Sequence, residues 1–498
     1  MHPDFASCNN AIIKFTFLPI NFTIIWNNNT TRLFMSLMVS ISGIRGVVGE
    51  DLTPPVIMDF VSSFASLLKK PWKSIIVGRD TRESGKFIEK IVEGTLIALG
   101  FEVINLGIAA TPTILLMTRK MDCNGGIAIT ASHNPSGWNA LKFCDKNGLF
   151  FNEDHVLRIE ELVKHHKILP ETWKGFDKLG AAFSESTAYL IHINEVLKGI
   201  DHELIKRKGF KVAIDPGGGA SSVIDKAFLK KLGCTVVGIH DQSNGLQAGR
   251  QFPRGLEPIP ENLTGLCKLV RSSGADIGFA QDPDGDRLAI VSESGKAIGE
   301  EYTLILAGKA YLRRKKTDMA CNLSSSMMID DLARRHGVCV HRTKIGEIYV
   351  TTKLLKENLL FGGEGNGGVI VPEINPCRDS IIAMGLILEL LATTEKTVSQ
   401  LINEFPTYVM KKGIIEIAEM DKGNLFINIH KKAKEHFSDY IINNIDGIKI
   451  YNNSEWLHIR PSNTEPVIRI MAESTDENRT DKLLRIGRSF FSSCRDKS

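Results

Sequence analysis

The 498-residue sequence contains no closely spaced cysteine pair and no long uninterrupted apolar run, and its charge is nearly balanced. Its nine cysteines are scattered, and no two of them form a Cys-x-x-Cys pair. This spacing excludes the common zinc motifs and gives no sign of a disulfide framework. Free thiols fit a reducing cytosol, so we expect a cytoplasmic protein. The cysteines are Cys8, Cys123, Cys144, Cys234, Cys267, Cys321, Cys339, Cys377 and Cys494.

The balanced charge and the lack of a long apolar run also limit the partners. A net charge of +4 is small for this length and argues against nucleic acid as the main partner. The most apolar stretch, residues 11–26, contains Pro19 and Asn21 and is too short to span a bilayer comfortably. It also lacks the basic start and small-residue cleavage site of a signal peptide. We therefore expect no membrane partner. We interpret residues 1–34 as an N-terminal extension, with a start codon placed too early as the alternative. Length and charge do not indicate an oligomeric state.

Strands alternate with helices in a pattern that occurs three times. Strand-and-turn segments at residues 74–80 and 211–219 each open one copy, and a looser third copy starts with a helix at 300–312. Such alternation indicates βαβ units and a largely parallel sheet. We predict an α/β protein with three similar mixed α/β domains in tandem and a smaller C-terminal α+β domain. The predicted domains cover residues 35–183, 184–297, 298–409 and 410–498.

In the first copy a polar loop, Thr-Ala-Ser-His-Asn-Pro-Ser-Gly-Trp-Asn at residues 130–139, follows the apolar strand 125–129. The end of a strand is where α/β proteins place chemistry. Ser132, with His133 beside it, is therefore a candidate nucleophile. A local capping role for the serine is the alternative.

In the second copy the loop at residues 282–287 reads Asp-Pro-Asp-Gly-Asp-Arg. Alternate side chains of an extended segment lie on one side, so Asp282, Asp284 and Asp286 would converge on one cation. Three carboxylates suit Mg²⁺, which prefers oxygen ligands. A calcium EF-hand is rejected, because arginine stands at the sixth position and a strand follows. A solvated acidic turn is the alternative.

Two later loops carry groups that suit sugars and anions. Residues 362–368 read Gly-Gly-Glu-Gly-Asn-Gly-Gly, in which Glu364 and Asn366 offer hydrogen bonds to hydroxyls; the loop is neither a Walker loop nor a Rossmann fingerprint. Residues 460–466 read Arg-Pro-Ser-Asn-Thr-Glu-Pro, a plausible phosphate nest to which Arg469 adds charge. Loop flexibility and a plain hairpin turn are the alternatives. A serine acceptor together with a carboxylate cluster indicates phosphoryl transfer.

These four loops, in this order, resemble those of the α-D-phosphohexomutase family, which includes phosphoglucomutase, phosphomannomutase and phosphoglucosamine mutase. The resemblance covers nearly the whole chain from about Met35 and implies three similar α/β domains and a fourth α+β domain. It implies a phosphoryl group on Ser132 and a hexose phosphate substrate. The implied ligands of Mg²⁺ are Ser132, Asp282, Asp284 and Asp286. The implied substrate-binding residues are Glu364 and Asn366 for the sugar hydroxyls, and Arg460, Ser462, Asn463 and Thr464, with Arg469, for the phosphate.

The resemblance also implies the catalytic groups. Arg45, in Ser-Gly-Ile-Arg-Gly, matches the arginine of an N-terminal family loop, and Lys142 matches a lysine proposed as an acid/base group. His133 and Arg287 complete the expected catalytic set. Phosphorylated Ser132 would donate its phosphoryl group to the substrate, and the resulting sugar bisphosphate would reorient and return its other phosphate. A sugar 1,6-bisphosphate is therefore the expected activator.

The sequence departs from the family pattern at three positions. Ala140 stands where many members have glycine, Gly368 where many have histidine, and Asn366 where serine is more usual. The loops are most similar to those of the phosphoglucosamine mutase subgroup. We therefore expect interconversion of glucosamine 6-phosphate and glucosamine 1-phosphate. The alternatives are a phosphomannomutase/phosphoglucomutase of the same mechanism, a metal-dependent phosphatase, and an inactive sugar-phosphate-binding paralogue.

Overall fold

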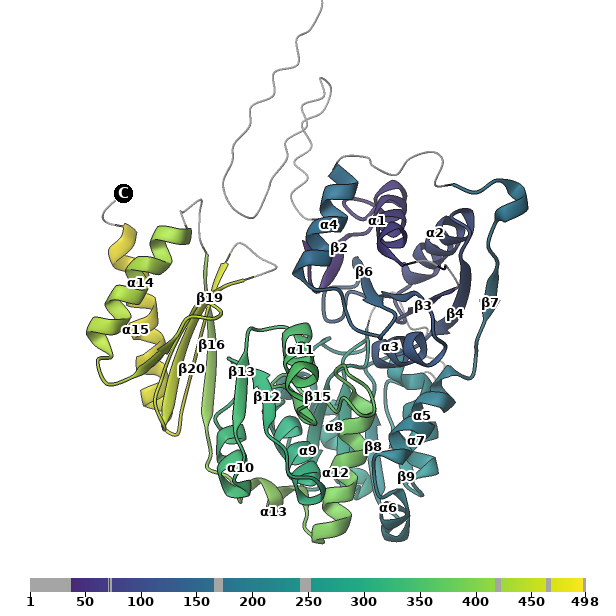
Figure 1. Cartoon of the computed structure of the whole chain (residues 1–498). Helices are drawn as coiled ribbons and strands as arrows, with labels where there is room; N and C mark the ends of the chain where they lie inside the picture. The colour runs from purple at the N-terminus through teal and green to yellow at the C-terminus, as the bar shows by residue number, and fades with distance from the viewer. Residues whose placement is uncertain are drawn as a thin grey trace, which may run out of the picture. The chain divides into compact units, whose positions relative to one another are not determined.

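The chain folds around four β-sheets, which follow one another along the sequence (Figure 1). The structure is a computed structural model, and it describes residues 37–69, 71, 74–164, 173–241, 252–416, 422–462 and 467–495. The predicted N-terminal extension, residues 1–34, lies outside the described residues. No helix in these ranges is both long enough and apolar enough to cross a membrane.

The first sheet contains seven strands in the order β1-β2-β6-β5-β3-β4-β7. Strands β3, β4, β5 and β7 run parallel, whereas β6, β2 and β1 each pair antiparallel to their neighbour. The strands are β1 Met38–Ser40, β2 Gly43–Val47, β3 Ser74–Arg79, β4 Glu102–Ile108, β5 Gly125–Ile129, β6 Trp138–Asp145 and β7 Ala182–Ser184. Its helices are α1 Pro54–Leu67, α2 Gly85–Ala98, α3 Thr111–Lys120 and α4 Glu153–Lys164.

The second and third sheets have four strands each and share one arrangement. Three parallel strands end in one antiparallel strand, in the orders β11-β10-β8-β9 and β13-β12-β14-β15. The strands are β8 Lys211–Asp215, β9 Thr235–Gly238, β10 Ile277–Gln281, β11 Leu288–Ser292, β12 Met319–Asn322, β13 Val340–Thr343, β14 Phe361–Glu364 and β15 Gly368–Ile370. The helices are α5 Ala188–Lys198, α6 His202–Lys208, α7 Asp225–Lys231, α8 Thr264–Ser273, α9 Glu301–Arg314, α10 Met328–His336, α11 Glu347–Glu357, α12 Ser380–Thr394 and α13 Val398–Ile402.

The fourth sheet is antiparallel throughout, in the order β16-β20-β19-β18-β17, and helices α14 and α15 cover one of its faces (Figure 1). Its elements are β16 Val409–Glu416, α14 Lys422–His436, β17 Ile441–Asn443, β18 Ile448–Tyr451, β19 Glu455–Pro461, β20 Val467–Ser474 and α15 Glu477–Arg495. A polar contact joins this sheet to the third unit: the Glu473 carboxylate accepts from the backbone N–H of Met327 at 2.8 Å. Within the fourth sheet the same carboxylate accepts from the Trp456 indole at 2.7 Å.

The predicted fold class is confirmed, with one refinement. In each of the first three sheets the candidate loop is a hairpin connection between a parallel strand and an antiparallel one: β5 to β6, β10 to β11, and β14 to β15. The sheets are therefore mixed, as predicted, and the antiparallel strands lie beside the candidate loops. The hairpins place three polar loops at corresponding positions of three similar units. The residue boundaries between the four domains stay a prediction.

The second and third sheets share one hydrophobic core. Phe228 and Ile277 of the second unit belong to the same buried cluster as Leu304 and Phe361 of the third. Helix α12, which the sequence did not predict, lies in this cluster with most of its side chains buried. A helix that is apolar around its whole circumference has no amphipathic period, so its pattern gives no helical signal.

A buried polar chain links the first three units. Thr113 Oγ1 and His192 Nδ1 are 2.8 Å apart, and His192 Nε2 lies 2.7 Å from Asp379 Oδ2. Asp379 also caps α12 by accepting from the backbone N–H groups of Ile381 and Ile382. Thr113 lies on α3 and His192 on α5, so one carboxylate stabilises a helix start and two packed helices together.

We expect the Asp379→Ala variant to lose about 3–5 kcal/mol of unfolding free energy, because the change leaves buried His192 and the α12 cap without their partner. Urea unfolding followed by circular dichroism measures the change. Lys353→Met is the control, since it breaks only a solvent-exposed ion pair with Glu357, and such pairs add little to stability. Equal losses in both variants would contradict the assigned role.

Asp225, at the start of α7, provides a pH-dependent test. Burial raises its pKa from 3.8 to about 8, although Gln281 donates a hydrogen bond to it. Its contribution to stability is therefore complete below about pH 4 and is lost as the pH rises through about 8. In Asp225→Asn, the unfolding free energy relative to the wild type should rise between about pH 5 and pH 8, by at most about 1.4 kcal/mol per pH unit. A constant difference in urea unfolding across this range would contradict the shift.

Candidate active site

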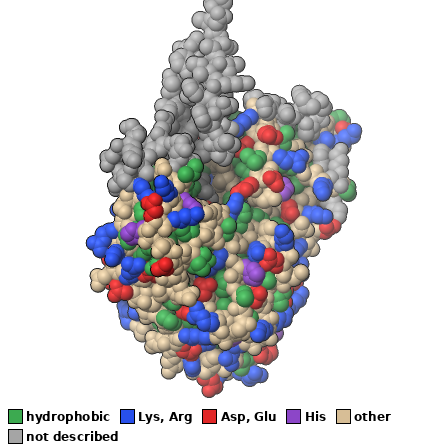
Figure 2. Space-filling model, turned by 60° about the vertical axis from the view of Figure 1, so that its left-hand side comes forward, with side chains coloured by type: hydrophobic (Ala, Val, Ile, Leu, Met, Phe, Trp, Pro, Cys, Tyr) green, Lys and Arg blue, Asp and Glu red, His purple; other side chains and the backbone are tan. Residues whose placement is uncertain are grey.

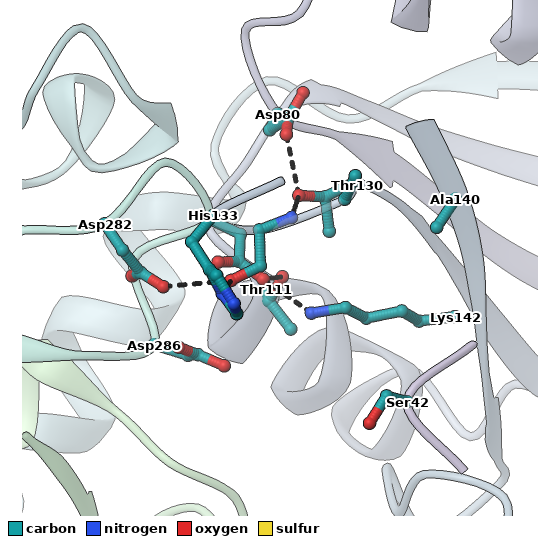
Figure 3. Close-up of polar contacts among 12 residues, drawn as sticks. Ser42, Asp80, Thr111, Thr130, His133, Ala140, Lys142, Asp282 and Asp286 are labelled. Carbon is teal, nitrogen blue, oxygen red and sulfur yellow. Dashed lines mark hydrogen bonds and ion pairs between the residues drawn. The ribbon is translucent and has the colours of Figure 1, made fainter. Parts of the chain in front are cut away.

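The hairpin between β5 and β6 presents Ser132 in a restrained backbone conformation. Its φ of 49° lies in the left-handed region, which residues other than glycine seldom adopt. The backbone N–H of Ser132 donates to Thr130 Oγ1 at 3.0 Å, and that hydroxyl donates to Asp80 Oδ2 at 2.6 Å. Figure 3 shows this bond between Thr130 and Asp80. The serine that the sequence predicted as nucleophile is thus held in place by its own loop.

Arg82, which no sequence motif indicated, also holds this loop. Its side chain is fully buried, and its guanidinium also pairs with Asp80 at 3.1 Å. It donates to four carbonyl oxygens of the loop, those of Ser132 (2.6 Å), Asn134 (2.7 Å), Pro135 (2.7 Å) and Trp138 (3.1 Å). Charge-assisted bonds to this many carbonyls fix the loop's path. The sequence offered little indication of this role, because the four loop partners of Arg82 are backbone carbonyls, which every residue has.

The hairpin between β10 and β11 brings together the three predicted carboxylates. Asp282, Asp284 and Asp286 are buried, and one oxygen of each lies within 4.8 Å of the others. The loop is not the extended segment that the spacing predicted. It turns at Gly285, whose φ is 70° and whose N–H donates to the carbonyl of Asp282. The turn, rather than strand alternation, makes the carboxylates converge.

The donor set fits a hard divalent cation. Asp284 Oδ1 and Asp286 Oδ1 are buried and have no hydrogen-bond partner among the described residues. Unpaired buried carboxylate oxygens are costly unless a cation neutralises them. Burial, together with the charges of Asp286 and Asp284, raises the pKa of Asp282 well above its usual range. These three residues could therefore hold Mg²⁺.

Residues 130–139, which carry Ser132, form the nucleophile loop, and residues 282–287, which carry the three aspartates, form the metal loop. The two loops are in direct contact. Ser132 Oγ donates to Asp282 Oδ2 at 3.1 Å. The backbone N–H of Thr111, at the start of α3, donates to the carbonyl of Asp284 at 2.8 Å, and its hydroxyl reaches Asp284 Oδ2 at 3.2 Å. The candidate nucleophile and the candidate metal ligands thus form one site, as the sequence predicted.

Basic side chains surround this pair of loops. Lys142 Nζ, on β6, lies 2.6 Å from Asp284 Oδ2, and Figure 3 shows it pointing into the cluster. Although burial opposes the charge of Asp284, this ion pair lowers the pKa of the carboxyl. Arg45 donates to Asn134 Oδ1 at 2.8 Å, and burial lowers its pKa to about 10. Both groups thus lie beside the serine and the aspartates, and their acid/base role stays a prediction.

His133 and Arg287 lie against each other beside the serine. His133 Nδ1 is 3.4 Å from Ser132 Oγ and 3.3 Å from Arg287 Nη2. Partial burial and the charges of Arg287 and Arg45 lower the pKa of His133, so its imidazole is neutral at physiological pH. A neutral imidazole can accept a proton or a hydrogen bond. Arg287 also lies 3.7 Å from Asp282 and 3.8 Å from Asp286.

In the third hairpin Glu364 is fixed on both of its oxygens. Its Oε1 accepts from Asn322 Nδ2 at 2.8 Å and from the N–H of Gly346 at 3.0 Å, and its Oε2 accepts from Arg378 Nη1 at 2.9 Å. The Oδ1 atom of Asn366, two residues later, is buried and has no partner among the described residues. The sequence identified Glu364 and Asn366, but not the residues that orient Glu364.

The fourth candidate loop follows β19. Arg460 is buried and donates to Asp446 Oδ1 at 3.3 Å, while its Nη2 has no partner in the described part of the chain. A buried guanidinium with an unused donor suits an anion. Arg469 stands directly opposite Arg460 on β20, so both side chains share one face of the sheet. Ser462 is buried beside them, whereas Asn463 and Thr464 lie outside the described residues.

The sequence matches four domain descriptions of one family, phosphoglucomutase/phosphomannomutase. These are alpha/beta/alpha domain I over residues 38–168, domain II over 187–295, domain III over 299–408 and the C-terminal domain over 418–485. Together they account for most of the chain. The chain belongs to this family. It is therefore an isomerase of the phosphohexomutase type.

Relatives within the family differ in the sugar that their names give. A phosphoglucomutase/phosphomannomutase of Thermococcus kodakarensis is 34% identical over 450 residues, covering 89% of this chain and 96% of its own. A phosphoglucosamine/phosphogalactosamine mutase of Sulfurisphaera tokodaii is 31% identical, with 90% and 98% covered. A solved phosphoglucomutase/phosphomannomutase family protein of Burkholderia thailandensis shares the fold at a TM-score of 0.78 and 22% identity, covering 93% of this chain and 99% of that one.

Thr130 offers a test of how the mutase holds its serine. The Thr130→Val variant keeps the side-chain shape but removes the hydroxyl that joins Ser132 to Asp80. We expect kcat to fall while KM changes little, and stability to drop by about 1–3 kcal/mol. Steady-state kinetics and urea unfolding measure the two effects. Thr95→Val is the control, since this buried hydroxyl of α2 bonds only to its own helix; equal activity of the two variants would contradict the role of Thr130.

Proposed function

We propose that the chain interconverts glucosamine 6-phosphate and glucosamine 1-phosphate through phosphorylated Ser132 and a sugar bisphosphate. The observation that carries this proposal is the contact between Ser132 Oγ and Asp282, inside a buried carboxylate cluster ringed by basic side chains. The amino sugar is supported by the name of the Sulfurisphaera tokodaii relative and by the Asn366-containing loop.

Each residue of the site has a part in the proposed transfer. The phosphoserine O–P bond breaks, and a new P–O bond forms to a sugar hydroxyl. The hydroxyl proton passes to an uncharged base of the site, either the neutral imidazole of His133 or the uncharged form of Lys142 or Arg45. Ser132 Oγ regains a proton when it leaves. Asp282, Asp284 and Asp286, with a phosphoserine oxygen, would hold Mg²⁺, which supplies positive charge against the transferring phosphoryl group. Arg287 adds charge at the same place.

Substrate recognition is assigned to the other two loops. Glu364 and Asn366 would bind the sugar hydroxyls, and Arg460, Ser462, Asn463, Thr464 and Arg469 would bind the phosphate that does not react. Arg460 supports this assignment, because its buried Nη2 donor is unused among the described residues. A sugar 1,6-bisphosphate would phosphorylate Ser132 at the start of turnover, as the mechanism requires. Two solved structures of the Aspergillus fumigatus N-acetylphosphoglucosamine mutase are complexes, one with GlcNAc-6P and magnesium and the other with glucose 1,6-bisphosphate.

A second candidate is a phosphomannomutase/phosphoglucomutase of the same mechanism, which the name of the Thermococcus kodakarensis relative favours. The two candidates share every residue assigned to phosphoryl transfer. They differ only in which hydroxyl or amino group the third loop accepts at the sugar ring.

The test is a turnover assay with Mg²⁺ and catalytic sugar 1,6-bisphosphate, using the 6-phosphates of glucosamine, glucose and mannose. We expect the highest kcat/KM with glucosamine 6-phosphate and no turnover after chelation with EDTA. The Ser132→Ala variant should lose about a thousandfold or more in kcat. Ser136→Ala, in the same loop, is the control and should keep its activity.

Each contrary outcome has a separate meaning. A preference for mannose or glucose phosphate would keep the mechanism and replace the proposed substrate. Inorganic phosphate released in step with substrate consumption would replace the mutase mechanism with a phosphatase. Full activity in Ser132→Ala would overturn the phosphoserine.

A further inference from the structure

Arg378 is a buried cation that the proposed transfer has not used. It lies between β15 and α12, directly before the α12 cap Asp379, and its side chain is 11% exposed. Its guanidinium reaches three carboxylates at once: Asp286 Oδ2 at 2.5 Å, Glu364 Oε2 at 2.9 Å and Glu347 Oε2 at 3.1 Å. Its backbone N–H also donates to Glu347 Oε1 at 2.9 Å.

Two of these carboxylates belong to different loops of the site. Asp286 is a candidate metal ligand on the hairpin after β10, and Glu364 is the candidate sugar-binding group on the hairpin after β14. One planar guanidinium therefore joins the metal loop to the sugar loop. The third partner, Glu347, starts α11 and fixes the other edge of the same guanidinium.

The contacts define which carboxylate oxygens stay available. Asp286 Oδ2 is taken by Arg378. Asp286 Oδ1 is buried and lies 3.8 Å from Nε of Arg287, but it has no hydrogen-bond partner among the described residues. Arg378 thus orients Asp286 so that its Oδ1 atom is left for a cation. Because Arg378, Asn322 and Gly346 all hold Glu364, its position is set relative to the same metal loop.

Gly368 provides the space through which the Arg378 side chain passes. A Cβ at this glycine would lie 2.2 Å from Cδ of Arg378 and 2.8 Å from its Cγ, which no real contact allows. This is the position at which the sequence departs from the histidine of many family members. A side chain larger than hydrogen at residue 368 and the observed course of Arg378 are mutually exclusive.

We propose that Arg378 is a positioning residue that couples the two loops, setting Asp286 for the divalent cation and Glu364 for the sugar through one guanidinium, in room left by Gly368. The inference rests on the proposed function for the roles of Asp286 and Glu364. Lysine would not replace arginine here, because its single ammonium lacks the planar array of donors that reaches three carboxylates.

The test measures both loops separately. Mn²⁺ serves as a probe of the metal loop, and its binding is followed by electron paramagnetic resonance without substrate. Steady-state kcat and KM, measured at a saturating concentration of the divalent cation, report the sugar loop. In Arg378→Gln we expect the affinity for Mn²⁺ to fall about 10- to 100-fold and kcat/KM to fall with it. Arg378→Lys should recover part of either the Mn²⁺ affinity or kcat/KM, but not of both.

Gly368→Ala is the second arm, and it leaves Arg378 in the sequence. The added methyl displaces the arginine stem, so this variant should show the same paired loss of Mn²⁺ affinity and kcat/KM. The matched control is Gly94→Ala in α2, where an added Cβ meets nothing within 4 Å. Arg314→Gln is the ion-pair control, because Arg314 pairs with Glu389 away from the site.

Free guanidinium provides a rescue that a merely structural role would not show. In Arg378→Ala, guanidinium well below denaturing concentrations should restore part of the lost Mn²⁺ affinity by filling the vacated position. Arg314→Gln should not respond. Circular dichroism and thermal unfolding establish which variants fold, and Gly368→Ala decides the question if the Arg378 variants do not.

The proposal is overturned if folded Arg378→Gln keeps wild-type Mn²⁺ affinity and kcat/KM, if Gly368→Ala behaves like Gly94→Ala, or if the wild type binds no Mn²⁺. These outcomes are distinct from failure of the proposed function. A wild type that prefers glucose or mannose phosphate loses the proposed substrate, while the Mn²⁺ measurements on the variants still decide the role of Arg378.

Discussion

Repulsion among three buried carboxylates is the constraint on which the site depends. Asp282, Asp284 and Asp286 lie together almost without solvent, where like charges interact strongly. Part of the compensating charge comes from other sheets, from Lys142 on β6 and from Arg378 before α12. The packing of the first and third units against the second therefore completes the charge balance of the metal loop. Folding and assembly of the site are coupled, since each unit alone would leave buried charge unpaired.

The side chains that carry the proposed chemistry were predictable, because they follow apolar strands in short polar loops. Ser132, Glu364 and the three aspartates all lie at or just after the end of an apolar strand, as the sequence pattern predicted. Their supports were not predictable. Arg82 bonds to backbone carbonyls, and Arg378 bonds to carboxylates from three distant segments, so neither has a local pattern. Helix α12 was not predicted from the sequence either. It is buried on every side, so its sequence lacks the alternation of apolar and polar residues, every 3.6 positions, that identifies a surface helix.

Hydrogen bonds connect the four loops in a continuous series. Asp446 accepts from Arg460 and from the N–H of Ile345, and the N–H of the next residue, Gly346, donates to Glu364. Glu364 pairs with Arg378, which pairs with Asp286. In the same loop as Asp286, Asp282 accepts from Ser132 Oγ of the first loop. On the face of the molecule shown in Figure 2, by contrast, Lys and Arg side chains are mixed with Asp and Glu side chains, and neither charge forms a continuous band.

The bond between the N–H of Thr111 and the carbonyl of Asp284 has an evolutionary consequence. It joins the first and second units through main-chain atoms, which every non-proline residue supplies. Point mutations therefore leave this spacing between nucleophile and metal ligands largely intact. The sugar loop is held by the side chains of Asn322 and Arg378, which a single substitution can replace. A substitution in this architecture can therefore alter the candidate sugar loop without moving the candidate nucleophile relative to the candidate metal ligands.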